Sequence, residues 1–444
     1  MIINPTATEA VEQNTISALE NLSVDIPVPV AEIDTVAKML WEKYKNEIRN
    51  KTDRQEENKE VPYTYPIKGG DHTTNVRTIS QNGRTMRFTV EKKGAKPENG
   101  YPVFIALHGG GGCPTEDNNG LWKDMQTIWS GDVNPGIYIA VRGITDTWNL
   151  HFQPESFSMY DRLIENAIAF EDADPNAIYL MGFSAGGDGV YDITAKMADR
   201  FGATNMMAGH PNSISIDNYA NVPFLIQMGE KDTEYNRHLE AARYDALLTS
   251  AAKSKGYGYI HETFIHPNGS HNSWQEKTYI SWSQPNDVID DIAAWLAANG
   301  SGGAIVKKNT ASVTWMLQHK RNPYPKRVIW NTKVLAPQRK IKQFYWLNAG
   351  TMLDGSTLDV ELEEGSNSIN IRESGNYVGI LLNSKMVDFN KPVNIIKNGE
   401  GVGVQVTPSL KKMVQTLVHR GDPNYIFPAE IIWENINGEL NISV

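Results

Sequence analysis

Four nearly continuous apolar runs constrain the fold of this chain more than any other feature of its sequence. The runs are YPVFIAL, GIYIAV, AIYLM and VPFLIQM, and segments with helical periodicity lie between them. Strands that helices cover on both faces read as continuous apolar runs, whereas a half-exposed strand such as MRFTV alternates. The pattern therefore predicts an α/β domain with a mostly parallel sheet and helices on both of its faces.

The character of the sequence changes twice along its 444 residues. Residues 1–60 hold an amphipathic helix between Ala31 and Asn50, and a densely charged stretch follows it. Beyond residue 323, alternating strands surround one helix at about 408–420, for which we expect Thr407 as the N-cap. We expect a helical N-terminal extension at 1–60, an α/β domain at 61–323 and a small β-rich domain at 324–444.

Charge and composition exclude several classes of partner. A net charge of −10 and a pI near 5.6 argue against nucleic acids and anionic membranes, which favour clustered lysine and arginine. The single cysteine, Cys113, excludes an internal disulfide and cysteine-based zinc sites. The chain has no run long enough for a membrane-spanning helix and begins without a signal-like segment, so we expect a cytoplasmic protein, and a trimmed secreted form would also fit. Its oligomeric state is not predicted.

A serine between glycines marks the candidate site. The stretch NAIYLMGFSAGGDGV places Gly182-Phe183-Ser184-Ala185-Gly186 directly after an apolar strand and before a helix. This G-x-S-x-G pattern is typical of a sharp strand-to-helix turn that exposes a nucleophilic hydroxyl at the carboxyl end of a sheet. Side chains at the flanking positions would collide, so glycine is expected there. We predict that Ser184 is a nucleophile.

A glycine run supplies the second element of the site. The strand VFIAL ends at His108, and four glycines follow, from Gly109 to Gly112. Backbone N–H groups can converge on one point in such a loop, and a developing oxyanion requires that arrangement. We expect the N–H groups of Gly109, Gly110 and Ala185 to form an oxyanion hole, and the alternative is a flexible turn.

A serine hydroxyl needs a base and a carboxylate that orients it. The strand VPFLIQM is followed by GEKDTE, which offers Asp232, with Glu230 and Glu234 as competitors. We favour Asp232 because it lies in a glycine-containing turn just past the strand.

Three of the histidines that follow Asp232 are candidates for the base. His261 and His266 belong to the strand-like segment YIHETFIH, where a structural hydrogen bond is the usual role, whereas His271 lies in the loop NGSHNSW. We predict that His271 is the base and keep His266 as the alternative. The resulting order of serine, aspartate and histidine is that of the α/β-hydrolases.

Metal catalysis and cofactors are not expected. The segment HETFIH resembles a zinc-binding helix, but its histidines are five residues apart instead of four and lie in a strand-like context. The glycine-rich GEGVGV lies among strand residues, so we do not read it as a phosphate loop. Cys113 follows the glycine run without a dedicated base and is expected to be a bystander.

Several other side chains are candidates for substrate contacts. Trp122, Trp148 and Trp274 could line an acyl or alcohol pocket, although buried tryptophans are more often packing residues. Arg142 follows the strand GIYIAV and could bind a substrate carboxylate, but a structural ion pair is the favoured interpretation.

The sequence resembles bacterial α/β-hydrolase esterases related to polyhydroxybutyrate depolymerases and feruloyl esterases. The resemblance covers about residues 84–323 and rests on LHGGGG, NAIYLMGFSAGGDGVY, MADRFGATNMMAGHPN, GEKDTEYNR and SHNSW. It extends less specifically into the tail through KRVIW, FYWL and LNSKMVDFNKPV, and residues 275–311 are an insertion relative to the group. The resemblance implies Ser184 as nucleophile, His271 as base and Asp232 as its orienting residue. It also implies an oxyanion hole from Ala185 and the Gly109–Gly110 region.

The expected activity is therefore hydrolysis of a carboxylic ester through an acyl-enzyme, with a small-molecule or polymer-derived ester as substrate. Two alternatives stay open. A serine peptidase or amidase would use the same three residues. A non-catalytic carbohydrate- or partner-binding protein would suit the β-rich tail, but the complete set of catalytic residue types argues against it.

Overall fold

The computed structural model describes residues 5–266, 269–271, 312–334, 342–350, 355–436 and 439–444. The described residues form two compact units, one of residues up to 55 together with those from 323 onward, and one of residues 56–322. The observed division differs from the expected three domains in one respect, because the N-terminal helices belong to the same compact unit as the C-terminal segment. In the described part of the chain, no helix has the length and apolar character needed to cross a membrane.

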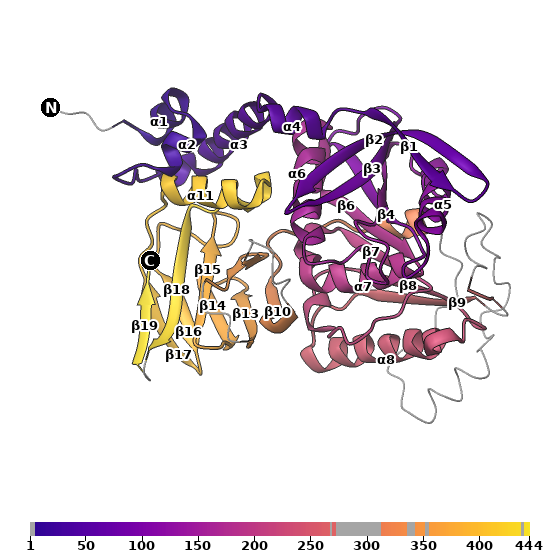
Figure 1. Ribbon diagram of the computed structural model, residues 1–444. Coiled ribbons are helices and arrows are strands. Elements are labelled where there is room, and N and C mark those ends of the chain that lie inside the picture. Colours follow the sequence, from indigo (N-terminus) through magenta and orange to yellow (C-terminus); the bar gives the residue numbers. More distant parts are fainter. Residues whose placement is uncertain (1–4, 267–268, 272–311, 335–341, 351–354, 437–438) are drawn as a thin grey trace. The chain divides into compact units, whose positions relative to one another are not determined.

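A nine-stranded sheet forms the centre of the unit at 56–322, in the order β1-β2-β3-β5-β4-β6-β7-β8-β9 (Figure 1). The pairs β1–β2, β2–β3 and β3–β5 are antiparallel. All further pairs in the sheet, from β5–β4 to β8–β9, are parallel. The strands are β1 (Val61–Ile67), β2 (Gly70–Gln81), β3 (Arg84–Lys93), β4 (Tyr101–Leu107), β5 (Gly136–Arg142), β6 (Ala173–Phe183), β7 (Ala203–Met207), β8 (Phe224–Gly229) and β9 (His261–His266).

Helices cover this sheet, as the apolar runs predict. Every residue of β4 and β5 is buried. The helices that contact the sheet are α5 (Thr115–Met125), α6 (Ser156–Phe170), α7 (Ala185–Met197), α8 (Arg237–Lys255) and α10 (Ser312–Met316). The strand order, the helical layers and the serine turn between β6 and α7 confirm the expected α/β-hydrolase fold.

The parallel strands bring the loops that carry the candidate site residues to one edge of the sheet. Register pairs such as Leu107 with Gly182 and Gly229 with His266 place the carboxyl ends of β4, β6, β8 and β9 along that edge. Loops at the carboxyl ends of such strands form the usual ligand crevice of α/β sheets.

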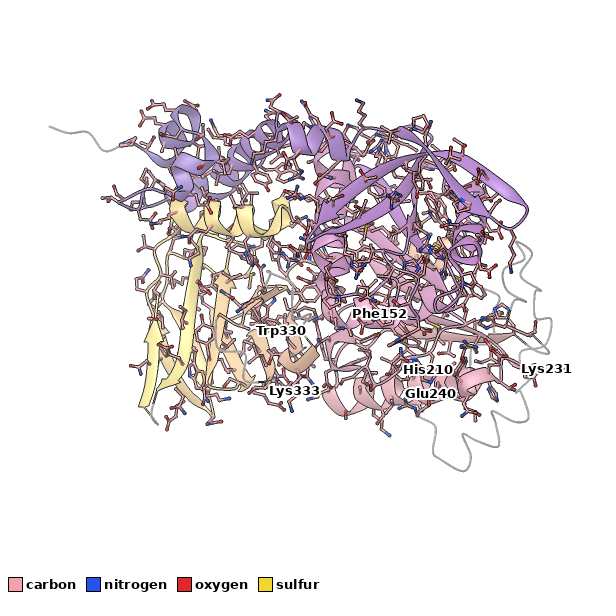
Figure 2. The ribbon with its side chains drawn as sticks, viewed as in Figure 1. Phe152, His210, Lys231, Glu240, Trp330 and Lys333 are labelled. Carbon is pink, nitrogen blue, oxygen red and sulfur yellow. The ribbon has the colours of Figure 1, made fainter. Side chains whose placement is uncertain are left out.

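Two five-stranded sheets form most of the other unit, in the orders β10-β13-β14-β16-β17 and β11-β12-β15-β18-β19. The pairing is antiparallel except between β14 and β16. Trp330 of β10, labelled in Figure 2, stacks on Phe344 of β11 and joins the two sheets in one core. The strands are β10 (Arg327–Asn331), β11 (Gln343–Phe344), β12 (Leu347–Asn348), β13 (Thr357–Glu363), β14 (Ser368–Glu373), β15 (Tyr377–Leu382), β16 (Val393–Lys397), β17 (Glu400–Val404), β18 (Ala429–Ile436) and β19 (Glu439–Ser443). Strand β17 takes up all of the segment GEGVGV except its first residue, Gly399, so the segment lies among strand residues as expected.

The N-terminal helices pack on helix α11 (Leu410–Arg420) of the same unit. They are α1 (Ala7–Gln13), α2 (Ile16–Glu20) and α3 (Ile33–Arg49), and α2 and α3 contact α11 directly. Helix α3 confirms the predicted amphipathic helix, because the residues spaced three or four apart along one of its faces are all buried: Ile33, Val36, Leu40, Tyr44 and Ile48. The charged stretch that follows contains a further short helix, α4 (Thr52–Glu57).

The predicted N-cap of α11 is wrong. Ser409, not Thr407, caps the helix by accepting a hydrogen bond from the N–H of Lys412 at 3.0 Å. The reason is that Pro408 and Ser409 are still held in an extended bridge, in which the Pro408 carbonyl accepts the N–H of Val28 at 2.8 Å. The helix ends at Gly421, which adopts the left-handed conformation at the C-cap and agrees with the expected helix end near residue 420.

Candidate active site

Ser184 occupies a strained turn between β6 and α7. Its φ of 55° and ψ of −120° lie in a region that residues with a side chain rarely adopt. A Cβ on Gly182 would lie 2.3 Å from the Gly186 carbonyl oxygen, and a Cβ on Gly186 would lie 2.3 Å from the Leu107 carbonyl oxygen. Both glycines are therefore required for the turn and for the packing of α7 against β4.

The structure brings Ser184, His271 and Asp232 together from three separate loops. The Oγ of Ser184 lies 2.9 Å from Nε2 of His271, and Nδ1 of His271 lies 2.6 Å from Oδ2 of Asp232. Asp232 is 2% exposed, whereas the His271 side chain keeps 31% of its surface accessible. The ring of His271 also packs against Phe183, with 5.1 Å between the ring centroids. This chain of hydrogen bonds is the geometry that activates a serine hydroxyl.

The competing acids and bases lie elsewhere. Glu234 is 81% exposed at its side chain and contacts only the guanidinium of Arg237, at 3.8 Å, among the contacts described for it. His261 lies 3.1 Å from the hydroxyl of Thr249, and His266 lies 3.3 Å from the amide oxygen of Gln227. Burial lowers the pKa of His266 to about 3, so this ring is neutral and structural. Glu230 contributes its backbone N–H to the His266 carbonyl.

Arg237 holds the second oxygen of the Asp232 carboxylate, a contact that the sequence did not reveal. Its Nη1 lies 3.3 Å from Oδ1 of Asp232, and its side chain is only 11% exposed. Tyr235 and Asn236, both in the left-handed conformation, reverse the chain so that the arginine at the start of α8 returns to the carboxylate. Asp232 therefore has an imidazole on one oxygen and a guanidinium on the other.

The glycine run lies against the serine. A Cβ on Gly109 would be 3.2 Å from Cβ of Ser184 and 3.0 Å from the ring of Phe183. Ala185 is the first residue of α7, so its N–H has no acceptor within the helix and lies at the positive end of the helix dipole. These positions agree with an oxyanion hole built from the glycine loop and from the residue that follows the serine.

His108 fixes the orientation of the glycine peptide. Its Nδ1–H donates to the Gly109 carbonyl at 2.6 Å, and its Nε2 accepts the N–H of Gly143 at 3.1 Å. Burial, His151 and Arg142 hold the pKa of His108 well below its usual range. The ring is therefore neutral, so one nitrogen can donate a hydrogen bond while the other accepts one. Because the C=O and N–H of a trans peptide point in opposite directions, the N–H of Gly110 points away from His108.

A polar network braces the other side of this loop. Asn118 accepts the N–H of Gly111 at 2.8 Å and donates to Asp146 at 2.9 Å. Arg142 pairs with the same carboxylate and donates to the Gly143 carbonyl at 2.8 Å, which makes it a structural residue, as favoured from the sequence. Burial and the charge of Asp117 raise the pKa of the Cys113 thiol, so this thiol is not activated.

The tryptophans proposed for a substrate pocket differ in their surroundings. Trp122 is 1% exposed, and its Nε1–H donates to the Ala140 carbonyl at 3.0 Å. It therefore belongs to the core between α5 and β5, and its assignment to a substrate pocket is corrected.

Trp148 is 55% exposed and packs edge-on against Phe152. Its backbone would lie 3.0 Å from a Cβ on Gly111, so it borders the glycine loop. Trp274 and the insertion at 275–311 lie outside the described residues.

Asp188 is a second acidic group close to the site. It lies one turn after Ser184 on α7, and its Oδ1 accepts the N–H of His210 at 2.6 Å. His210, labelled in Figure 2, belongs to the loop after β7. Burial raises the pKa of Asp188 to about 6, and the hydrogen bond from the His210 N–H and the charge of Arg237 partly oppose that shift.

The histidines of HETFIH have no metal-binding geometry. They lie in strand β9, where residues five apart point to opposite faces of the sheet. Among the described residues, no cluster of three or more His, Cys, Asp or Glu side chains could hold a metal ion.

Comparisons with known proteins identify no family for this chain and find only distant structural likenesses. No family model matches the sequence, and no curated protein matches it. Similar solved structures include a thermostable esterase (16% identity, 60% of this chain and 64% of that one, TM-score 0.37). Another is a poly(3-hydroxybutyrate) depolymerase from Bordetella parapertussis, at 16% identity over 60% of this chain and 99% of that chain, with a TM-score of 0.39. A third is a ferulic acid esterase, at 18% identity over 45% of this chain and 92% of that chain, with a TM-score of 0.31. At these identities and TM-scores the likenesses carry no weight for activity.

Proposed function

We propose that this protein is a serine hydrolase that cleaves carboxylic esters. The observation that supports the proposal is the continuous hydrogen-bonded chain from Ser184 through His271 to Asp232, with distances of 2.9 and 2.6 Å. The His271 side chain is 31% exposed and Ser184 is only partly buried, as a site that a substrate reaches requires. Such an arrangement serves acyl transfer.

The reaction proceeds in two steps. His271 accepts the proton of Ser184 while the hydroxyl oxygen attacks the ester carbonyl, and Asp232 stabilises the imidazolium that forms. The oxyanion of the tetrahedral intermediate receives hydrogen bonds from the N–H groups of Ala185 and the Gly109–Gly110 segment. The alcohol leaves with the proton from His271, and an acyl group stays on Ser184. Water then repeats the sequence, releasing the acid and restoring the serine.

The substrate is a small-molecule or polymer-derived ester, without cofactor or metal. Trp148 is the proposed aromatic contact for the acyl or alcohol part, because it is exposed and borders the glycine loop. A panel of esters that varies the acyl and the alcohol parts separately defines the substrate class.

The activity test compares the wild-type protein with Ser184→Ala, His271→Ala and Asp232→Ala on an activated ester and on the matching amide. We expect ester turnover in the wild type and a loss of roughly 10⁴-fold or more in kcat for the serine and histidine variants. Amide turnover that exceeds ester turnover would instead identify a peptidase or amidase. A folded wild type without turnover of either substrate would support a non-catalytic binding protein.

A further inference from the structure

The loop that follows strand β7 lies between the strand that carries the proposed nucleophile and the strand that precedes its orienting acid. The sheet order β6-β7-β8 places this β7 loop, residues 208–212, between the Ser184 turn and the loop that holds Asp232. The Ser184 N–H donates to the Met207 carbonyl at 2.9 Å, and the Ala208 N–H donates to the Gln227 carbonyl of β8, also at 2.9 Å. The position of the β7 loop therefore affects the spacing of the proposed catalytic residues.

The backbone of the β7 loop packs directly on the first turn of α7. A Cβ on Gly187 would lie 2.6 Å from the Met207 carbonyl oxygen, and a Cβ on Gly209 would lie 2.4 Å from the Gly187 carbonyl carbon. Both segments are strained, because φ is 55° at Ser184 and 49° at Ala208. Residues with a side chain stay in this conformation only where the surrounding structure holds them. The two segments therefore need contacts that keep them together.

The Asp188 carboxylate joins the two segments. The Asp188 N–H donates to the Ser184 carbonyl at 2.9 Å, so this side chain leaves α7 one turn after the serine. Its Oδ1 accepts the N–H of His210, in the β7 loop, at 2.6 Å. A hydrogen bond to a carboxylate is about twice as strong as one between neutral groups. With the bond from Ser184 to Met207, these contacts close a hydrogen-bonded ring in which the Asp188 carboxylate is the single side chain.

We propose that Asp188 is a positioning residue of the active site, which holds the strained Ser184 turn against the β7 loop. The inference rests on the proposed function and deepens it. Without the carboxylate, the His210 N–H loses its acceptor and the Ser184 turn loses the support that maintains its backbone conformation. The Oγ of Ser184 then departs from Nε2 of His271. A displacement of about 1 Å between catalytic groups can lower a rate about 100-fold.

Steady-state kinetics of the full chain on an activated ester compare the wild type with Asp188→Ala and Asp188→Asn. The measurements are made at about pH 8, above the Asp188 pKa of about 6. Alanine removes the acceptor, whereas asparagine keeps an oxygen for the His210 N–H. We expect the alanine variant to lose at least about tenfold in kcat with KM within about twofold of the wild type, and the asparagine variant to stay within about threefold in kcat. Asp188→Ser takes the place of the alanine variant if the latter does not fold.

Hydrogen–deuterium exchange with mass spectrometry measures the ring without a substrate. We expect a peptide that covers residues 206–214 to exchange at least about tenfold faster in Asp188→Ala, because a protected amide exchanges only when its hydrogen bond opens. Asp188→Asn should exchange like the wild type. Asp192→Ala is the matched control, since Asp192 lies one turn further along α7, is 6% exposed and pairs with Lys196 of the same helix at 2.6 Å. This control should keep the wild-type kcat and the wild-type exchange of the peptide.

Three results would overturn the proposal. The first is a folded Asp188→Ala protein with a lower melting temperature but the wild-type kcat, which would show a merely structural role. The second is unchanged exchange of residues 206–214 in this variant. The third is a higher KM without a loss of kcat, which would identify a substrate contact instead. A wild type without ester turnover would overturn the proposed function and this inference together, whereas any of the three results with an active wild type overturns this inference alone.

Discussion

Arg237 donates to Oδ1 of Asp232 at 3.3 Å, the oxygen that His271 does not use. A carboxylate that a guanidinium holds on one side has fewer orientations available for the imidazole on the other side. The relationship makes Arg237 a positioning residue of the proposed active site, acting through Asp232 and not on the substrate.

Arg237→Met should lower kcat about tenfold and leave KM nearly unchanged, because it removes a charge-assisted hydrogen bond that orients Asp232. Steady-state kinetics on an activated ester measure the effect. Arg237→Lys should restore part of kcat, since an ammonium can still approach the carboxylate. A purely structural role would instead lower the melting temperature of the methionine variant while kcat of the folded protein stays at the wild-type level.

Gly186→Ala should destabilise the α/β unit by roughly 3 kcal/mol or more, because the new Cβ meets the Leu107 carbonyl oxygen at 2.3 Å. Gly120→Ala is the matched control. Gly120 lies within helix α5, and its added Cβ has open space, so we expect a gain of up to about 1 kcal/mol. Chemical denaturation measures both, and equal stabilities of the two variants would contradict the packing described for the serine turn.

The serine turn illustrates what could be predicted from the sequence. Ser184 and its flanking glycines lie within five consecutive residues, and the apolar run before them specifies a buried strand. The local sequence alone therefore predicts the nucleophile turn. Asp232 and His271 followed from chain order and from their place after strands, because parallel strands bring their carboxyl ends to one edge. The structure adds the distances that join the three side chains.

Gly110→Ala should lower kcat on the order of 10²-fold, because a Cβ at this position lies 2.3 Å from the Asn118 amide oxygen and would turn the peptide whose N–H we propose as an oxyanion-hole donor. Gly112→Ala is its control. Gly112 also has a positive φ, of 63°, but its Cβ would meet nothing within 4 Å. Similar losses of kcat in both variants would show that backbone strain alone accounts for the effect and that the Gly110 peptide has no special role.

Asp188→Asn should change the dependence of stability on pH. The pKa of Asp188 is about 6 in the folded state, against an ordinary value of 3.8. At a pH between 3.8 and about 6, the Asp188 carboxyl keeps its proton in the folded state but has released it in the unfolded state. The stabilising contribution of Asp188 is therefore complete below about pH 4 and is lost as the pH rises through 6. The asparagine does not titrate and still accepts the His210 N–H. Its melting temperature relative to the wild type should therefore rise between pH 4 and pH 7, and a constant difference would contradict the shift.

The residues that sequence reasoning missed depend on contacts between distant or irregular segments. Trp122 is assigned to the core only once β5 supplies the carbonyl for its indole N–H. Arg237 reaches Asp232 through two consecutive left-handed residues, and Tyr235 gives no sequence signal for such a conformation. The packing of the N-terminal helices on α11 joins segments almost 400 residues apart, and periodicity shows only that α3 has a face to bury.

Covalent labelling tests the central claim most directly. The wild-type protein is treated with a fluorophosphonate, and intact mass spectrometry followed by peptide mapping locates the adduct. The account predicts a single adduct on Ser184 that is absent from Ser184→Ala and strongly slowed in His271→Ala. A folded wild-type protein that takes up no label, or that carries it on a residue other than Ser184, would contradict the account.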